Sequence, residues 1–202
     1  MECLALFFSG TGGNALNLLQ ACRAGRVPAR VVLGLASTPR AGGIARLAAE
    51  GVPVRVQLRS AHPDDAAFSR ACYDLAEAAG AGVIALCGWL KKLDVPPRWE
   101  GRILNIHPGL LPAFGGPGMW GAHVHRAVLA SGAAESGCTV HLVDGLYDHG
   151  RILAQARVPV LPGDTPEELQ RRVYEQEMRL YPEALAAYLG SAGQQLHRQE
   201  RT

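Results

Sequence analysis

Short continuous apolar runs alternate with helix-spaced apolar positions along the first half of the chain. Such runs, bounded by glycines or polar turns, are typical of strands buried on both faces of a sheet. In the longest helical stretch, apolar residues from Phe68 to Ala79 recur at the period of an amphipathic helix. The alternation predicts an α/β fold with a mostly parallel, Rossmann-like sheet and helices on both faces. The predicted strands are residues 4–8, 31–36, 52–58, 83–87 and 102–106, and the helices between them are residues 15–22, 42–50 and 63–79.

The second half of the chain predicts a C-terminal antiparallel strand pair. Apolar and polar residues alternate over residues 137–143, and the run 152–160 can pair with them across a polar loop. A helix is expected before this pair, over residues 123–131. The pair therefore extends the parallel sheet at one edge.

A strong start signal marks the last helix. Thr165–Glu168 forms a capping box with proline at the first helical position. We expect the helix to bend at Pro182 and to end at Gly190. This predicts a single domain over residues 1–190, followed by a polar tail over residues 191–202 that is frayed at its end.

A glycine-rich turn, Ser9–Asn14, follows the first strand and opens a helix. This arrangement aims backbone N–H groups at an anion. The turn also fits the dinucleotide fingerprint, but that fingerprint expects an acidic residue at the end of the second strand, and residues 37–40 contain none. Arg40 leaves an NADP site open. A small phosphorylated ligand fits better, and a tight turn without a ligand is the third alternative.

Asn105 and His107 lie two residues apart at the end of the fifth strand, so their side chains point to the same side. An amide donor and a group that titrates near neutrality can together polarise a carbonyl and move a proton. Taken alone, the pair is equally consistent with a polar strand end. Ligands of open α/β sheets bind beyond the carboxyl ends of the strands. The segments expected to share that rim are Gly10–Asn14, Gly88–Leu93 and Asn105–Pro112.

Two further features come after this pair. The loop Phe114–Gly121 is rich in glycine and is either a mobile lid or a plain surface excursion. His123 and His125 are spaced by one residue without a nearby third ligand, so no metal site is expected.

Composition narrows the function classes. The 202 residues suffice for one domain with a sizeable core, and a net charge of +2 is too small to indicate nucleic acid or membrane as the main partner. The five scattered cysteines favour a reducing, cytoplasmic location. The N-terminus lacks the basic start of a signal peptide, and no apolar run reaches the roughly 18 residues of a membrane span. Monomer and homodimer both remain open.

Several motifs, in one order over nearly the whole chain, resemble a known family. It is the glycinamide ribonucleotide formyltransferase family, whose folate-dependent enzymes act in purine synthesis. The motifs are Ser9–Asn14, Asn105–Pro112, His141–Asp144 with Asp148, Gln155–Val160, Gly163–Thr165 and Tyr181–Leu185.

The resemblance implies formyl transfer from 10-formyltetrahydrofolate to the amine of glycinamide ribonucleotide, without a metal. Asn105, His107 and Asp148 match the family's catalytic residues. Asn105 would donate to the tetrahedral oxyanion, His107 would donate as an imidazolium, and Asp148 would favour that charged form. The Leu111–Pro112 bond is expected to be cis.

The resemblance also implies the binding residues. Gly12, Gly13 and Asn14 match the loop that holds the substrate phosphate, and Glu177 matches an acid near the glycinamide end of the substrate. The segment that lines the folate pocket corresponds to Leu90, Lys91, Lys92 and Leu93, together with Asn105.

The chain departs from the family in four places. Asp65 stands where some members carry an arginine that contacts the folate. Lys91 and Lys92 replace an apolar–basic pair, and they could meet the glutamate tail of the folate instead. Gly109 replaces a common serine, and the Phe114–Gly121 loop is longer than in many members.

Other functions stay open beside this one. Methionyl-tRNA formyltransferase and formyltetrahydrofolate hydrolase share the core but add a domain for which we expect no room. A formyltransferase for a different small amine, an NADP-dependent oxidoreductase and a non-catalytic nucleotide-binding module are the further alternatives.

Overall fold

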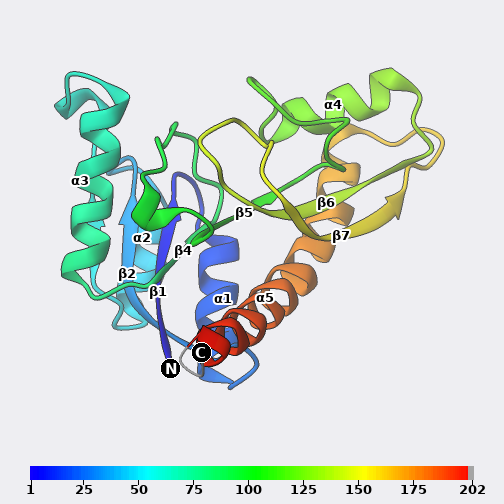
Figure 1. Cartoon of the computed structure of the whole chain (residues 1–202). Helices are drawn as coiled ribbons and strands as arrows, with labels where there is room; N and C mark the ends of the chain where they lie inside the picture. Colours follow the sequence, from blue (N-terminus) through cyan, green and yellow to red (C-terminus); the bar gives the residue numbers. More distant parts are fainter. Residues whose placement is uncertain (200–202) are drawn as a thin grey trace.

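The computed structural model describes the backbone of residues 1–199 and the side chains of residues 1–191 (Figure 1). Strands and helices alternate along most of the chain, as the apolar pattern predicts. The strands are β1 Glu2–Phe8, β2 Ala29–Ala36, β3 Val54–Val56, β4 Val83–Leu86, β5 Ile103–His107, β6 Glu135–Leu142 and β7 Ile152–Pro159. The helices are α1 Gly13–Arg23, α2 Gly43–Ala49, α3 Asp65–Ala78, α4 Ala122–Ser131 and α5 Pro166–Gln199, with short 3-10 turns η1 Arg59–Ala61 and η2 Pro97–Trp99.

All seven strands form one sheet in the order β3-β2-β1-β4-β5-β6-β7. The pairs among the first five strands are parallel, whereas β6 pairs antiparallel with both β5 and β7. The predicted fold class, including the antiparallel C-terminal pair, is therefore confirmed.

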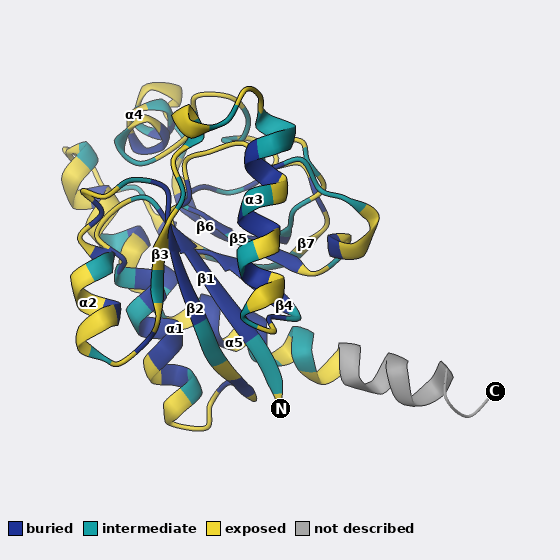
Figure 2. Cartoon of the chain, turned by 90° about the vertical axis from the view of Figure 1, so that its left-hand side faces the viewer, coloured by how far each residue is buried: buried dark blue, intermediate teal, exposed yellow. Residues whose placement is uncertain are grey.

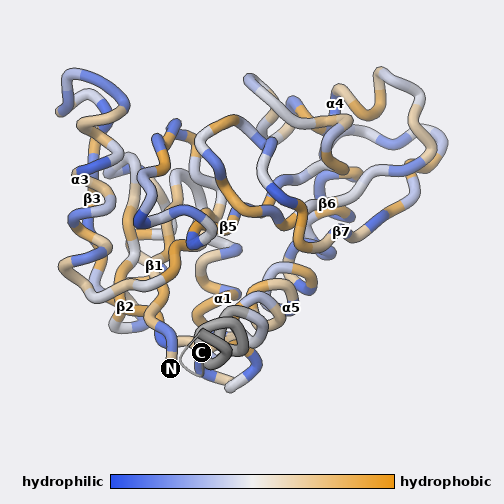
Figure 3. Tube along the Cα trace, viewed as in Figure 1, coloured by the Kyte–Doolittle hydropathy of each residue, from blue (hydrophilic) through white to orange (hydrophobic). Residues whose placement is uncertain are grey.

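Two hydrophobic cores cover the two faces of the sheet. One core packs α1, α2, α4 and α5 against one face, and the other packs α3 and η2 against the opposite face. Along β1, Leu4, Leu6 and Phe8 enter the first core, and Ala5 and Phe7 enter the second. A strand buried on both faces needs apolar residues at every position, which explains the continuous run. Figure 2 shows the buried strands at the centre, and Figure 3 shows hydrophobic positions along β1 and β2.

The third strand is shorter than the predicted run 52–58. Only Val54–Val56 pair with β2, because β3 is the edge strand, in which Val54 is partly buried and Arg55 and Val56 are exposed.

The last helix begins as predicted but does not end at Gly190. Thr165 Oγ1 accepts from Glu168 N at 3.2 Å, and Glu168 Oε2 accepts from Thr165 N at 2.8 Å, which is the reciprocal capping box. Gly190 does not adopt the left-handed conformation that stops a helix, and α5 continues to Gln199. Pro182 lies inside this helix. The tail that was expected to fray is helical up to Gln199, and only residues 200–202 lie outside the described residues.

The loop after β5 contains a cis peptide bond. It joins Leu111 to Pro112, as predicted. In the part of the chain that the structure describes, no helix has both the length and the apolarity of a membrane span.

Candidate active site

A pocket of about 490 Å³ opens at the carboxyl ends of the parallel strands. β1 and β4 are neighbours, but the chain leaves β1 towards β2 and leaves β4 towards β5, on opposite sides. Such a switch point is where ligands of open α/β sheets bind. The pocket wall contains residues of all three segments that were predicted to share this rim: 10–14, 88–90 and 105–108.

The glycine turn forms one end of this pocket. Gly12 has a φ of 73°, and a Cβ there would lie 2.5 Å from the backbone Cα of Gly43, so only glycine fits. α1 begins at the next residue without a side-chain cap, which leaves its first N–H groups free to bind an anion. A Cβ on Gly13 would lie 2.1 Å from the hydroxyl of Tyr174, so this tyrosine covers the turn. Tyr174 was not predicted as a site residue.

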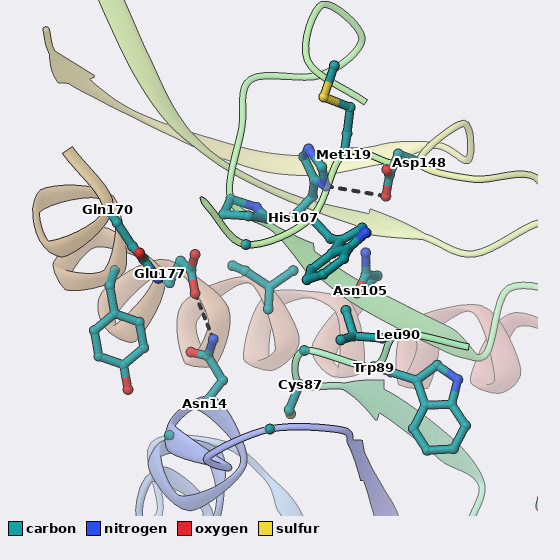
Figure 4. A pocket seen from close by; sticks show the side chains of 18 of the residues that line it. Asn14, Cys87, Trp89, Leu90, Asn105, His107, Met119, Asp148, Gln170 and Glu177 are labelled. Carbon is teal, nitrogen blue, oxygen red and sulfur yellow. Dashed lines mark hydrogen bonds and ion pairs between the residues drawn. The ribbon is translucent and has the colours of Figure 1, made fainter. Parts of the chain in front are cut away.

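A buried carboxyl group lies beside the turn. Asn14 Nδ2 donates to Glu177 Oε2 at 2.7 Å, a bond drawn in Figure 4. Glu177 is only 8% exposed, and this burial raises its pKa to about 7 despite the opposing hydrogen bond from Asn14. The Oδ1 atom of Asn14 is buried without a partner. The residue pair thus supplies a polar group that titrates near neutrality in the wall of the pocket.

Asn105, His107 and Asp148 meet at the other end (Figure 4). The first two leave the end of β5, and Asp148 comes from the loop between β6 and β7. His107 Nδ1 lies 3.4 Å from Asp148 Oδ1. Burial alone would raise the pKa of Asp148, but hydrogen bonding to His107, the charge of that ring and a hydrogen bond from the N–H of Gly116 hold that pKa well below its ordinary value. Asp148 is therefore a carboxylate at neutral pH.

The imidazole of His107 faces an acceptor on each side. Its Nε2 lies 2.6 Å from the carbonyl oxygen of Phe114, and its Nδ1 faces Asp148. A carbonyl and a carboxylate can only accept, so the doubly protonated imidazolium satisfies both contacts. A substrate oxygen or nitrogen must replace one of these acceptors to receive a proton from the ring.

His141 orients the amide of Asn105. The two residues are register partners in the β5–β6 ladder. His141 Nδ1 donates to the carbonyl of Leu142 at 2.8 Å, so its Nε2 can accept from Asn105 Nδ2 at 3.1 Å. The second N–H of Asn105 remains for a ligand. Sequence reasoning missed His141 as a site residue because its role depends on the antiparallel register.

The Phe114–Gly121 loop belongs to the site, so the plain surface excursion is excluded. Gly116 N donates to Asp148 Oδ2 at 3.1 Å, and residues 116–121 line the pocket. Trp120, 50% exposed, stands at the pocket wall with its ring against that of His123. His125 is buried in the same wall, where burial lowers its pKa to about 4 and its Nδ1 has no partner.

The predicted folate segment spans two pockets. Leu90 lines the larger pocket, whereas Lys91, Lys92 and Leu93 line a smaller one of about 80 Å³. The two pockets share four wall residues: Trp89, Asn105, Tyr147 and Asp148. 

Two residues that the sequence left in question lie outside both walls. Asp65 forms an ion pair with Arg59, at the start of α3. Arg40, which kept the NADP alternative open, lines neither pocket.

Two relatives are similar to this chain in sequence over about nine tenths of its length. The phosphoribosylglycinamide formyltransferase of Haemophilus influenzae is 33% identical over 184 residues, which are 90% of this chain and 84% of that protein. The chloroplastic enzyme of the same name from Arabidopsis thaliana is 43% identical, over 91% of this chain and 64% of its own length. The chain thus spans less than two thirds of this plant relative.

Solved structures agree with the sequence matches. The crystal structure of glycinamide ribonucleotide transformylase 1 from Symbiobacterium toebii is 38% identical, with a TM-score of 0.86 over 94% of this chain and 89% of that one. Phosphoribosylglycinamide formyltransferase from Brucella melitensis is 40% identical, with a TM-score of 0.83 over 93% and 95%. The sequence profile of the family described as formyl transferase matches residues 3–185. The chain therefore belongs to the formyl transferase family.

Proposed function

We propose that this protein transfers the formyl group of 10-formyltetrahydrofolate to the amine of glycinamide ribonucleotide, giving formylglycinamide ribonucleotide and tetrahydrofolate in purine biosynthesis. The observation that carries the proposal is the cluster of Asn105, His107 and Asp148 in one pocket with a phosphate-type glycine turn. The relatives named for this activity support the same choice of substrates.

The two substrates would enter from opposite ends of the pocket. The phosphate would bind the N–H groups of Gly12, Gly13 and Asn14, with Glu177 facing the body of the ribonucleotide. The folate would lie along Leu90–Leu93, where Lys91 and Lys92 offer positive charge to its glutamate tail. The formyl carbon would then lie beside Asn105.

The chemistry follows from the side chains at that position. The substrate amine attacks the formyl carbon, and the carbonyl oxygen becomes an oxyanion that accepts the free N–H of Asn105. As the tetrahedral intermediate collapses, the imidazolium of His107 gives a proton to N10 of the leaving folate, and the attacking nitrogen, positively charged after attack, gives a proton to the neutral imidazole and so regenerates the imidazolium. Asp148 stabilises the imidazolium before transfer.

A spectrophotometric assay of the purified protein tests this proposal. We expect turnover with glycinamide ribonucleotide, and a fall in kcat of roughly 10²–10⁴-fold in His107→Ala, the size of a lost general acid. Circular dichroism of both proteins verifies folding. Absence of turnover by the folded wild-type protein with this amine, but turnover with another, would assign the site to a different small amine.

Cytoplasmic location, and a monomeric or homodimeric state, also remain proposals. The five cysteines are all free thiols in the structure, which suits a reducing compartment. Fractionation of cells and light scattering of the purified protein test the two proposals separately.

A further inference from the structure

Two serine hydroxyls hold the ends of the irregular segment that links the two pockets. The segment Leu90–Asp94 contains no helix or strand. At its first residue, Leu90 N donates to Ser9 Oγ at 2.9 Å. At its last residue, Asp94 N donates to Ser69 Oγ at 3.0 Å. Both ends of the segment are thus attached through side chains that lie far away in the sequence.

The Ser9 hydroxyl extends the hydrogen bonding of the sheet beyond the ends of the parallel strands. The β1–β4 ladder continues through Ser9 N, which donates to Gly88 O at 3.0 Å. The next donor along this side, Leu90 N, meets the Ser9 hydroxyl in place of a main-chain carbonyl. From the β2 side, the buried Ser37 donates to the same oxygen at 2.7 Å. Ser9 therefore receives a hydrogen bond from each neighbouring strand end, at the first residue of the glycine turn.

Ser69 is equally fixed at the other end. It lies in α3 and is 2% exposed. Its hydroxyl donates to the carbonyl of Asp65 at 2.6 Å while it accepts from Asp94 N. An ion pair between Lys92 and Asp94, at 3.3 Å, closes the same end of the segment.

We propose that Ser9 and Ser69 are positioning residues that set the path of the Leu90–Asp94 segment, and that Ser9 also couples this segment to the glycine turn. The inference rests on the proposed function, in which the segment binds the folate and the turn binds the phosphate. Ser9 lies in the turn and also contacts the segment, so its loss should weaken the binding of both substrates. Loss of Ser69 should weaken the folate alone.

Steady-state kinetics of Ser9→Ala and Ser69→Ala test this asymmetry. A single neutral hydrogen bond predicts changes of roughly three- to tenfold. We expect Ser69→Ala to raise KM for 10-formyltetrahydrofolate by that factor and to leave KM for glycinamide ribonucleotide unchanged. Ser9→Ala should raise both KM values. Ser69→Thr, which keeps the hydroxyl, should restore the folate KM.

Ser136 offers a matched control. It is fully buried in β6, and its hydroxyl has no partner, so Ser136→Ala should leave both KM values unchanged. If Ser9→Ala fails to fold, Ser37→Ala tests the same coupling, since it removes only the supporting donor and should raise both KM values more weakly. Equal effects of Ser9→Ala and Ser69→Ala on both substrates, or a folate KM unchanged in either, would overturn the proposal.

Calorimetric titration with tetrahydrofolate separates this inference from the proposed function. Tetrahydrofolate should bind Ser69→Ala roughly three- to tenfold more weakly than wild type. A wild-type protein that binds tetrahydrofolate without formylating glycinamide ribonucleotide would contradict the proposed function, and the titration would still decide the role of Ser69. Equal affinity of the two proteins would overturn that role.

Discussion

The two ends of the pocket are built in different ways. At the glycine turn, backbone atoms pack so closely that a single added carbon on Gly12 meets Gly43 at 2.5 Å. At the histidine end, the groups are side chains held by charge and hydrogen bonds, as between His107 and Asp148. The first end depends on shape, and the second depends on protonation. Under the proposed function, changes at the turn should therefore alter binding of the ribonucleotide, and changes at the histidine end should alter the chemical step.

The largest effect is expected from Asp148→Asn. The amide keeps the size of the side chain but cannot stabilise the imidazolium of His107, so kcat should fall by roughly 10²–10⁴-fold, as in comparable carboxylate–histidine pairs. KM for glycinamide ribonucleotide should change less than threefold. Steady-state kinetics give both constants.

Stability measurements complete this first test. The pKa of Asp148 is depressed in the folded protein, so its stabilising contribution is present at neutral pH and is lost as pH falls through the folded value. The difference in unfolding free energy between wild type and variant should therefore shrink in acid. If the loss in free energy of unfolding were as large as the increase in activation free energy that corresponds to the fall in kcat, Asp148 would have a structural role.

Glu177 tests whether the turn end is purely steric. Its pKa is raised by burial from 4.5 to about 7, so between these values the folded protein binds more protons than the unfolded chain. Stability of the ligand-free protein then falls as pH rises through this window. Glu177→Gln removes the effect, and its unfolding free energy relative to wild type should rise by on the order of 2–3 kcal/mol between pH 5 and pH 8.

Urea denaturation at the two pH values measures this difference. The amide oxygen of the variant can still accept from Asn14, so the packing of the turn is retained. Glu167→Gln, at an exposed position in the first turn of the same helix, is the control and should show no such change. A pH-independent difference for Glu177→Gln would mean that the carboxyl group stays ionised throughout.

Gly12→Ala tests the steric requirement at the turn end of the pocket. The left-handed φ of 73° alone costs a non-glycine residue about 1–3 kcal/mol, and the clash with Gly43 adds to it. KM for glycinamide ribonucleotide should rise by roughly ten- to a hundredfold, while kcat at saturation changes little. Gly25→Ala is the matched control, because Gly25 has nearly the same left-handed φ of 72°, a Cβ there meets nothing within 4 Å, and it lines neither pocket. Equal effects of the two substitutions would remove the steric explanation.

The same contrast explains what could be predicted from the sequence. The strand runs, the glycine turn and the Asn105–His107 spacing are local patterns. Each predicts a secondary-structure element or the side to which side chains point. His141 was missed because its contact with Asn105 depends on the register of β5 and β6. The helix end at Gly190 was wrong because glycine permits a stop but does not impose one.

The loop after β5 shows most clearly which contacts the sequence could not predict. Its glycines indicate a turn-rich segment, but sequence could not show that Phe114 O accepts from His107 or that Gly116 N donates to Asp148. These are contacts of backbone atoms, a C=O that every residue carries and an N–H that every residue except proline carries, so residue type holds almost no signal for them.

The smallest effect is expected from Tyr174→Phe. The hydroxyl of Tyr174 lies against Gly13, and among the described residues that line the larger pocket there is no lysine or arginine. The phosphate would therefore rely on neutral donors, of which this hydroxyl is one, and its loss should raise KM for glycinamide ribonucleotide roughly three- to tenfold. The folate KM and kcat should stay unchanged, because the ring that covers the turn remains.

Tyr188→Phe is the control for loss of a tyrosine hydroxyl in the same helix, because the Tyr188 hydroxyl donates to the carbonyl of Gly101, far from the pocket. An unchanged KM in Tyr174→Phe would leave the phosphate to the backbone donors of the turn alone, and so would sharpen the division between an end that works by shape and an end that works by charge.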